Sequence, residues 1–257
     1  MNRGAMISVR EVTRRFGGLT AVDRVSFDVA ARGITGLIGP NGAGKTTMLS
    51  MLAGQLHPQS GQILLDGRNV EALPAHRLHA LGLARTFQIP RPFRRLTVLE
   101  NLLLARPAQS GERLTNVLWQ RAAIAAAERA ATVRAHALLD DLRLGDLAHA
   151  PAGELSGGQH KLLELARALM AAPRVLVLDE PCAGVNPAGI EFLSETIFRL
   201  RNDGLTFVIV EHNIDFVARH CDHVVVMAQG QVLTEGSPAE VRRDPRVLEA
   251  FLGPAHG

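Results

Sequence analysis

The order of apolar and polar residues along the chain predicts several buried strands. Unbroken apolar runs end at Ile38, Leu178 and Val210, and the type of residue changes abruptly after each of them. Such runs are typical of strands that are buried on both faces of a sheet. Alternating positions predict further strands at residues 6–12 and 19–29. With helices between the strands, this pattern indicates an α/β fold.

Helices are expected in the regions between and after these strands. Residues 112–144 are rich in Ala, Leu and Arg and contain no glycine, so they are predicted to be helical. Thr97 with Glu100, and Ser237 with Glu240, have the spacing of a capping box, which marks the first turn of a helix. Shorter helices are predicted at residues 47–53, 73–81 and 190–200. A strand between two turns is predicted at residues 60–67, a strand at residues 82–88, and a hairpin of residues 224–227 and 231–233 around Gly230.

Residues 39–47, with the sequence GPNGAGKTT, carry the strongest chemical signal. They match G-x-x-x-x-G-K-[ST] between a predicted strand and a predicted helix, which is the setting of a phosphate-binding loop. Glycines let successive backbone N–H groups converge on phosphate oxygens, and the helix start adds its positive dipole end. Lys45 is expected to reach the β- and γ-phosphates, and the Thr46 hydroxyl to bind Mg²⁺. A glycine-rich turn without a ligand is the alternative. The residues predicted to bind a nucleoside triphosphate are Gly39, Pro40, Asn41, Gly42, Ala43, Gly44, Lys45, Thr46 and Thr47.

Polar residues that follow predicted strands are candidates for catalysis. Ligands of open α/β sheets gather at the carboxyl ends of strands, so Asp179 is expected to hold Mg²⁺, directly or through water. Glu180 would then polarise the attacking water, and His212 would hydrogen-bond the γ-phosphate. Gln88 is a candidate to orient a water or to complete the Mg²⁺ shell. The alternatives are a surface carboxylate for Glu180 and a structural histidine for His212.

A second glycine-rich helix start lies at residues 155–159, far from the first along the chain. Ser156 can cap the helix that follows, and the glycines leave backbone N–H groups uncovered at its positive end. A plain capped helix start is the alternative to a second anion cradle. The members of this motif are Leu155, Ser156, Gly157, Gly158 and Gln159.

Composition narrows the class of protein. The 257 residues have a net charge of +3, with 47% hydrophobic and 21% charged residues, which is ordinary for a globular protein. Arg91, Arg94 and Arg95 form the densest basic group and are expected to be solvated or to face a partner, so no nucleic-acid partner is expected. Of 28 Lys and Arg, only Lys45 and Lys161 are lysines, and a compact ammonium fits between phosphates better than a guanidinium.

The expected location is the cytoplasm. Cys182 and Cys221 are too few for a disulfide framework, which favours a reducing compartment. The N-terminus has no signal-peptide pattern, and no apolar run approaches the roughly 18 residues that span a bilayer.

These motifs, in this order and over essentially the whole length, resemble the ATP-binding cassette family, the nucleotide-driven subunits of membrane transporters. Phosphate loops are shared with kinases and GTPases, whereas a motif such as that at residues 155–159 between loop and carboxylates is not. The resemblance makes residues 39–46 the Walker A loop, Gln88 the Q-loop glutamine, residues 155–159 the family signature, Asp179 and Glu180 the Walker B pair, residues 183–186 the D-loop and His212 the switch histidine.

The resemblance implies a single domain with a characteristic fold. It has a P-loop NTPase core with a mixed sheet at about residues 1–88 and 165–257, an N-terminal antiparallel β subdomain, and an inserted α-helical subdomain at about residues 89–164 that carries the signature. It also implies ATP and Mg²⁺ as cofactors and a head-to-tail homo- or heterodimer of cassettes, in which the signature contacts the partner's ATP. Further implied partners are integral membrane permease subunits, contacted near residues 88–96 at the inner face of the membrane, and a periplasmic or extracellular solute-binding protein.

The base of the nucleotide is assigned to one aromatic residue. Phe16 matches the aromatic that stacks on adenine, usually a Tyr, and Val22 is expected beside it in the nucleotide site. A core aromatic is the alternative for Phe16. Departures from the family pattern are His160 and Lys161 after the signature and Asn186 in the D-loop, and none removes a catalytic group.

Within the family, residues 85–88 and 247–253 look most like the ATPases of branched-chain amino acid importers. Importers of urea or short amides resemble them closely and compete for the same assignment. Three further functions compete with import: an export or lipid-extraction cassette, a soluble cassette protein that acts on ribosomes or DNA, and a small-molecule kinase.

Overall fold

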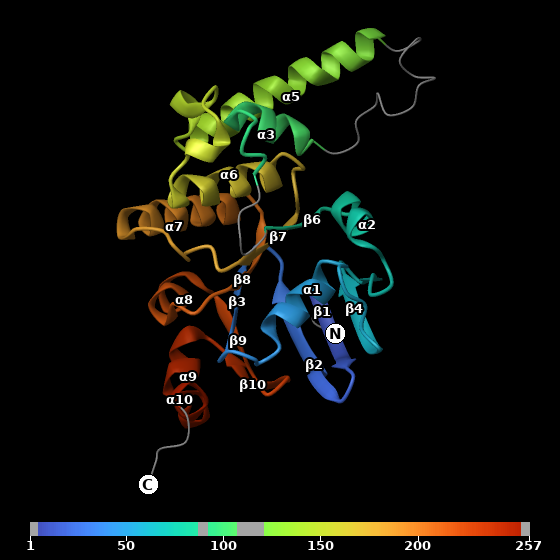
Figure 1. Cartoon of the computed structure of the whole chain (residues 1–257). Helices are drawn as coiled ribbons and strands as arrows, with labels where there is room; N and C mark the ends of the chain where they lie inside the picture. The colour runs from blue at the N-terminus through green and yellow to red at the C-terminus, as the bar shows by residue number, and fades with distance from the viewer. Residues whose placement is uncertain (1–4, 87–91, 107–120, 253–257) are drawn as a thin grey trace. The chain divides into compact units, whose positions relative to one another are not determined.

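A computed structural model of the chain describes residues 5–86, 92–106 and 121–252 and divides into two compact units (Figure 1). The first comprises Met1–Gln88, Arg174–Ala183 and Ser194–Gly257, and we call it the core unit. The second comprises Ile89–Pro173 and Gly184–Leu193, and we call it the helical unit.

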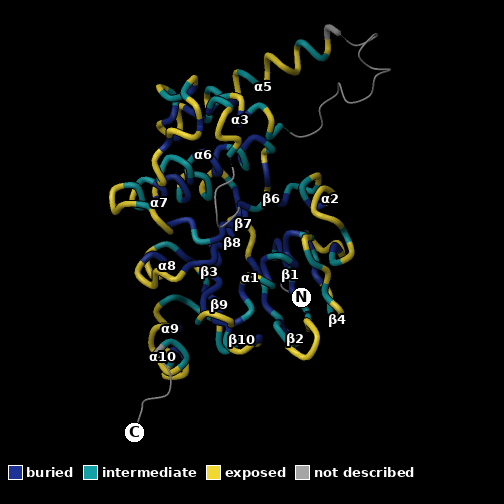
Figure 2. Tube along the Cα trace, in the orientation of Figure 1, coloured by how far each residue is buried: buried dark blue, intermediate teal, exposed yellow. Residues whose placement is uncertain are grey.

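The core unit contains a six-stranded sheet with the strand order β10-β9-β3-β8-β7-β6. All neighbouring pairs are parallel except β10 with β9, so the predicted mixed sheet is confirmed. The strands β3, β7 and β8 are buried at every position, in line with their mainly apolar sequences (Figure 2). The strands are β3 (Ile34–Ile38), β6 (Leu83–Arg85), β7 (Val175–Asp179), β8 (Thr206–Val210), β9 (His223–Ala228) and β10 (Gln231–Gly236).

A second sheet in the core unit is antiparallel and has the order β2-β1-β4-β5. Its strands are β1 (Ala5–Phe16), β2 (Leu19–Ala30), β4 (Ser60–Leu65) and β5 (Arg68–Asn69). Val9 and Val25 of this sheet share one apolar core with Leu49 of helix α1 (Lys45–Leu52) and with Val177 of β7. The predicted N-terminal antiparallel subdomain is therefore present, and its core anchors the start of α1.

The helices of the core unit include a short one that the sequence pattern did not predict. Helix α8 begins directly after the polar segment that contains His212, and the Oδ1 atom of Asn213 caps it by accepting the N–H of Phe216 at 3.0 Å. Seven residues with two buried positions are too few to reveal a helical period. The helices are α1, α2 (Ala75–Ala80), α8 (Ile214–His220), α9 (Pro238–Arg243) and α10 (Pro245–Leu252), and α7 (Pro187–Asn202) belongs partly to each unit.

The helical unit is built from α3, α5 and α6 with two short 3-10 turns. The capping box predicted at Thr97 is formed there, and the one predicted at Ser237 is formed in the core unit. Ser156 caps α6 as predicted, and Gln159 completes a capping box that the sequence analysis did not predict. The chain leaves this unit at Pro173 and returns to it for residues 184–193, a return that the sequence pattern did not predict. The helices are α3 (Val98–Leu104), α5 (Arg121–Asp141) and α6 (Gly157–Leu169), and the turns are Gly145–Leu147 and Ala152–Glu154.

Two further expectations concern the whole chain. Cys182 and Cys221 are both buried, and they do not form a disulfide with each other. Within residues 5–86, 92–106 and 121–252, no helix combines the length and the apolar character needed to cross a bilayer.

Candidate active site

The loop between β3 and α1 can be formed only with glycine at two of its positions. Gly39 and Gly44 have φ angles of +150° and +98°, which residues with a side chain rarely adopt. A Cβ atom on Gly39 would collide with the carbonyl oxygen of Met227, and one on Gly44 with that of Ala21. The backbone of the loop therefore lies directly against the backbone of β9 and β2.

Lys45 lies at the start of α1, which has Gly44 at its N-cap and no side-chain cap. The lysine is 6% exposed, and its Nζ donates to the carbonyl oxygens of Gly39 at 2.7 Å and Pro40 at 2.9 Å. Burial lowers the pKa of Lys45, and the negative charges of Glu180 and Asp179 oppose that shift. The helix start thus combines uncapped backbone N–H groups with a buried cation, which suits a phosphate chain.

A cleft of about 650 Å³ lies over this loop and contains three of the groups that the sequence predicted. The loop residues from Asn41 to Thr47, the carboxylate Glu180 and the imidazole of His212 all contribute to its walls. The lining residues are Phe16, Leu19, Thr20, Ala21, Asn41, Gly42, Ala43, Gly44, Lys45, Thr46, Thr47, Glu180, His212, Gln229 and Gly230. The contributions of Gln229 and Gly230, from the β9–β10 turn, carried no recognisable sequence signal.

Phe16 and Val22 differ in their access to the cleft. Phe16 is 44% exposed and lines the cleft, so it is not a core aromatic, and the guanidinium carbon of Arg14 lies 5.0 Å from its ring centroid. Val22 is 0% exposed within the apolar core and is not among the described residues that line the cleft. Phe16 is therefore accessible from the cleft, whereas Val22 belongs to the apolar core.

Glu180 and His212 meet in the cleft. The Nε2 atom of His212 lies 3.0 Å from the Oε1 atom of Glu180, and both side chains are partly exposed. Glu180 has a φ of +49°, in the left-handed region, and its backbone N–H donates to the carbonyl of Val210 at 2.9 Å. An unusual backbone conformation of this kind persists only where the surroundings hold it.

Asp179 forms a buried ion pair that the sequence pattern did not predict. The Nη2 atom of Arg85, on β6, lies 2.8 Å from Asp179 Oδ2, and the two side chains are 9% and 3% exposed. Arg85 also donates to Ser50 Oγ at 3.1 Å and to Gln55 Oε1 at 2.7 Å. An arginine at the end of a buried strand was the available signal, because such a charge is almost never buried without a partner. Arg85 thus fixes one oxygen of Asp179 and connects β7 to α1.

The signature lies at the start of α6 in the helical unit. Ser156 Oγ accepts the N–H of Gln159 at 3.4 Å, and Gln159 Oε1 accepts the N–H of Ser156 at 2.8 Å. Leu155 is buried, Ser156 and Gly157 are exposed, and Gly158 is half-buried. The exposed serine and glycine are therefore open to a ligand, while the Gln159 side chain is engaged within the helix start.

The departures from the family pattern have structural roles in the helical unit. A ring nitrogen of His160 lies 2.8 Å from the carbonyl oxygen of Ala152, which ties α6 to the preceding turn. Asn186 Oδ1 accepts the N–H of Gly189 at 2.8 Å in the first turn of α7. Gln88 lies outside the described residues.

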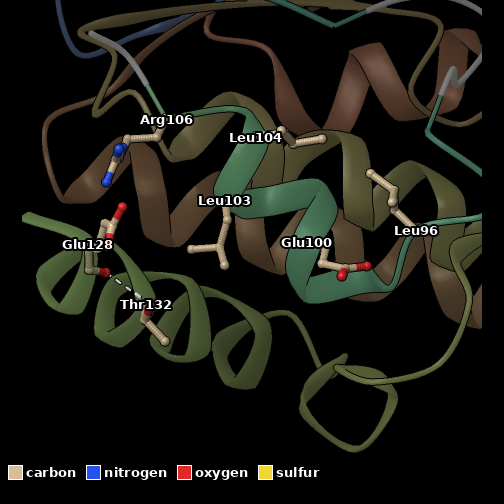
Figure 3. Close-up of a pocket in the computed structure, with 7 residues that line it drawn as sticks. All are labelled: Leu96, Glu100, Leu103, Leu104, Arg106, Glu128 and Thr132. Carbon is tan, nitrogen blue, oxygen red and sulfur yellow. Dashed lines mark hydrogen bonds between the residues drawn. The ribbon is translucent and has the colours of Figure 1, made fainter. Parts of the chain in front are cut away.

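The helical unit also contains a groove of about 510 Å³ between α3 and α5 (Figure 3). Leu103 points from α3 toward α5, where the hydroxyl of Thr132 donates to the carbonyl of Glu128 at 2.9 Å. The lining residues are Leu96, Glu100, Leu103, Leu104, Arg106, Glu128 and Thr132. The groove is thus apolar along its leucines and charged at its rim.

The chain is similar to known proteins over nearly its whole length. The sequence model of the family described as "ABC transporter" matches residues 22–183, and that described as "Branched-chain amino acid ATP-binding cassette transporter" matches residues 231–254. The probable branched-chain amino acid transport ATP-binding protein LivG of Archaeoglobus fulgidus is 40% identical, over 96% of this chain and 95% of the relative. The high-affinity branched-chain amino acid transport ATP-binding protein BraF of Pseudomonas aeruginosa is 39% identical, over 97% of this chain and 98% of the relative.

Solved structures agree with this similarity. A nucleotide-free ATP-binding cassette from an ABC transporter has a TM-score of 0.86 and 34% identity, over 97% of this chain and 99% of that one. An ATP-binding cassette of an ABC transporter in its ADP conformation has a TM-score of 0.83 and 33% identity, over the same shares of the two chains.

Proposed function

The chain belongs to the ABC transporter family, and on this premise we propose that it powers the import of branched-chain amino acids by hydrolysing ATP. The observation that carries the proposal is the single cleft in which the phosphate loop, Glu180 and His212 come together. The choice of solute is supported by the match of residues 231–254 and by the names of the relatives.

The roles of the cleft residues follow from their chemistry. The amides of the loop and Lys45 bind the β- and γ-phosphates, and Phe16 stacks on the base. Glu180 accepts a proton from the attacking water. The Nε2 atom of His212 lies 3.0 Å from Glu180 Oε1, and when ATP is bound its N–H would donate to the γ-phosphate instead of to that carboxylate. Little covalent chemistry is required, because phosphoryl transfer depends mainly on positioning and on stabilising charge.

The oxygen donors near the loop fit Mg²⁺. The Thr46 hydroxyl is exposed in the cleft, and the carboxylate of Asp179 is held at the end of β7. In the part of the chain that the structure describes, no three His, Cys, Asp or Glu side chains cluster around a metal position. This fits Mg²⁺, which typically binds one or two protein oxygens together with substrate phosphates. Bound Mg²⁺ would neutralise charge that develops between the β- and γ-phosphates. The proposed ligands are Thr46, Asp179 and Gln88.

The proposed partners are those of a transporter subunit. A second cassette would supply Ser156 and Gly157 of its own signature to this chain's ATP, and this chain's signature would act in the same way on the partner's. Permease subunits would contact residues 88–96, of which Leu96 lines the groove of Figure 3. With these partners the chain would act at the cytoplasmic face of the membrane. The solute-binding protein would act at the opposite face.

The catalytic proposal is tested with Glu180→Gln. We expect turnover to fall by about 10²- to 10⁴-fold, because the proton acceptor is lost, while ATP affinity is retained. Phosphate release and binding of a fluorescent ATP analogue measure the two quantities. Glu235→Gln is a matched control, since Glu235 also lies beside a histidine, His223, at 3.5 Å, but outside the cleft. Equal turnover in Glu180→Gln and the wild type would remove Glu180 from its assigned role.

The solute is tested by reconstitution with the candidate permeases in vesicles. Leucine, isoleucine and valine are expected to stimulate ATP hydrolysis when their binding protein is present. Stimulation by urea or short amides instead would reassign the solute and leave the ATPase function standing.

A further inference from the structure

We propose that Glu211 is a positioning residue for ATP hydrolysis, which aligns Glu180 and His212 through their backbones. The inference rests on the proposed function and adds a residue that acts through the backbone of two loops.

Glu211 is a buried carboxylate at the carboxyl end of β8, with 4% of its surface exposed. Its Oε1 atom accepts the backbone N–H of Cys182 at 2.7 Å. Its Oε2 atom accepts the N–H of His212 at 3.1 Å and, more weakly, that of Asn213 at 3.4 Å. A single side chain therefore binds the backbone of two different loops.

These loops carry the two side chains that meet in the cleft. Cys182 is two residues beyond Glu180, and His212 follows Glu211 directly. The strands that lead into the loops are neighbours, since Asp179 of β7 pairs with Val210 of β8. The 3.0 Å contact between Glu180 and His212 thus depends on the positions of two strand ends. Glu211 connects the loop that follows β7 to the loop that follows β8.

The backbone of Glu180 needs such support. Its φ of +49° is unfavourable for a residue with a side chain, so the conformation persists only while neighbouring contacts hold it. The N–H of Glu180 is held by Val210, and its carbonyl accepts the N–H of Ala183 at 3.2 Å. Glu211 holds the intervening residue, Cys182, and so completes the set of contacts around this turn.

The geometry requires a carboxylate. Ionised Glu offers two acceptor oxygens, and both are used here to receive N–H groups. A Gln side chain of the same size has one acceptor oxygen and an NH₂ group, which would face a backbone donor at one of the two loops. Glu211→Gln should therefore release one loop while preserving side-chain volume.

The test compares Glu211→Gln with Asp222→Asn in the full chain. Asp222 is a matched control, because its Oδ2 also accepts a backbone N–H, that of Ile34 at 2.8 Å. Ile34 is the first residue of β3, so this bond lies at the amino ends of the parallel strands, whereas Glu211 lies at their carboxyl ends. We expect Glu211→Gln to lower kcat by about 10- to 100-fold with the KM for ATP unchanged, since small misplacements of catalytic groups have effects of this size. Asp222→Asn should leave both constants within about twofold of the wild type. Equal effects of the two variants on kcat would show a general structural role and overturn the inference.

Two further variants keep the test decisive. Glu211→Asp retains both acceptor oxygens on a shorter side chain and should therefore have a higher kcat than Glu211→Gln. This variant also provides a test if Glu211→Gln folds poorly. In a Glu180→Gln background, Glu211→Gln should lower the residual rate no further, because residues that act as a unit are not additive. A further loss of the residual rate in the double variant would contradict the inference.

The two levels of the proposal fail separately. An unchanged kcat in Glu211→Gln, in a chain whose wild type hydrolyses ATP, overturns the inference and leaves the proposed function intact. A wild-type chain that does not hydrolyse ATP overturns both.

Discussion

Two helices of this protein, α1 and α6, start at glycine-rich turns, and the chain treats their N-termini differently. At α1 the N-cap is Gly44, no side chain caps the helix, and the first helical residue is the buried Lys45. At α6 the N-cap is Ser156, and a reciprocal capping box with Gln159 uses backbone donors of the first turn. The first turn of α1 therefore leaves its backbone N–H groups and a cation available to a ligand. In α6 the capping box occupies some of the backbone N–H groups, and a serine and a glycine remain exposed.

This difference indicates that the starts of α1 and α6 have different roles in nucleotide binding. A site with uncapped amides and a buried ammonium can hold a polyphosphate alone. A capped start with exposed Ser156 and Gly157 is a weaker anion site, suited to completing contacts to a nucleotide that is already bound elsewhere. Under the proposed function, α1 determines affinity and α6 determines turnover in the dimer.

Among changes at the two helix starts, the largest effect is expected from Ser156→Arg. A long cation at this helix start should block approach of the partner's nucleotide, so turnover should fall by about 10²- to 10³-fold, as when a transition-state donor is removed. Nucleotide affinity of the single chain should remain unchanged. ATPase assays and calorimetric titration separate the two quantities, and Ser237→Arg, at the matching capping box of α9, is the control. Normal turnover in Ser156→Arg would mean that α6 takes no part in hydrolysis.

Lys45→Ala should act on affinity. Loss of the ammonium removes charge-assisted hydrogen bonds, each of which contributes about 1.5–3 kcal/mol, so ATP affinity should fall by about 10- to 100-fold. Titration calorimetry on the single chain measures this. The chain's other lysine, Lys161, lies in α6, and Lys161→Ala should leave ATP affinity of the single chain unchanged. A similar loss in both variants would erase the distinction between the two helix starts.

Alanine at a glycine of each helix start should have opposite effects on stability. Gly44 has a φ of +98°, and a Cβ there meets the carbonyl of Ala21, so Gly44→Ala should lower the free energy of unfolding by more than about 1 kcal/mol. Gly158 has ordinary space, with the Val185 Cγ1 atom at 3.7 Å, so Gly158→Ala should raise that free energy by about 0.4–1 kcal/mol. Urea unfolding measures both, and effects of the same sign would contradict the structural distinction.

The sequence was most informative where local rules apply. The capping boxes at Thr97 and Ser237 were predicted from spacing alone, and Ser156 was predicted as a helix cap, because the bonds that define these caps join residues three positions apart. The buried strands followed from their apolar runs for a similar reason. Helix α8 was missed because it is short, and its cap, Asn213, lies in a segment whose polar residues suggested only chemistry.

Contacts between distant residues could not be predicted in this way. Arg85 and Asp179 are 94 positions apart and become a pair only because β6 and β7 are neighbours in the sheet. The hydrogen bond from Cys182 to Glu211 likewise depends on the pairing of β7 with β8. Val22 shows the converse. It was assigned to the nucleotide site together with Phe16, but its position on β2 directs its side chain into the apolar core.

The sequence by itself determined which residues are candidates for the chemistry, because a phosphate loop, a capped glycine turn and two carboxylates after an apolar strand are local patterns with local physical causes. Only the tertiary structure decided which of these residues meet. The order of strands in a parallel sheet is set by long-range packing, and it is this order that brings Glu180, His212 and the backbone bonds of Glu211 to one edge of the sheet.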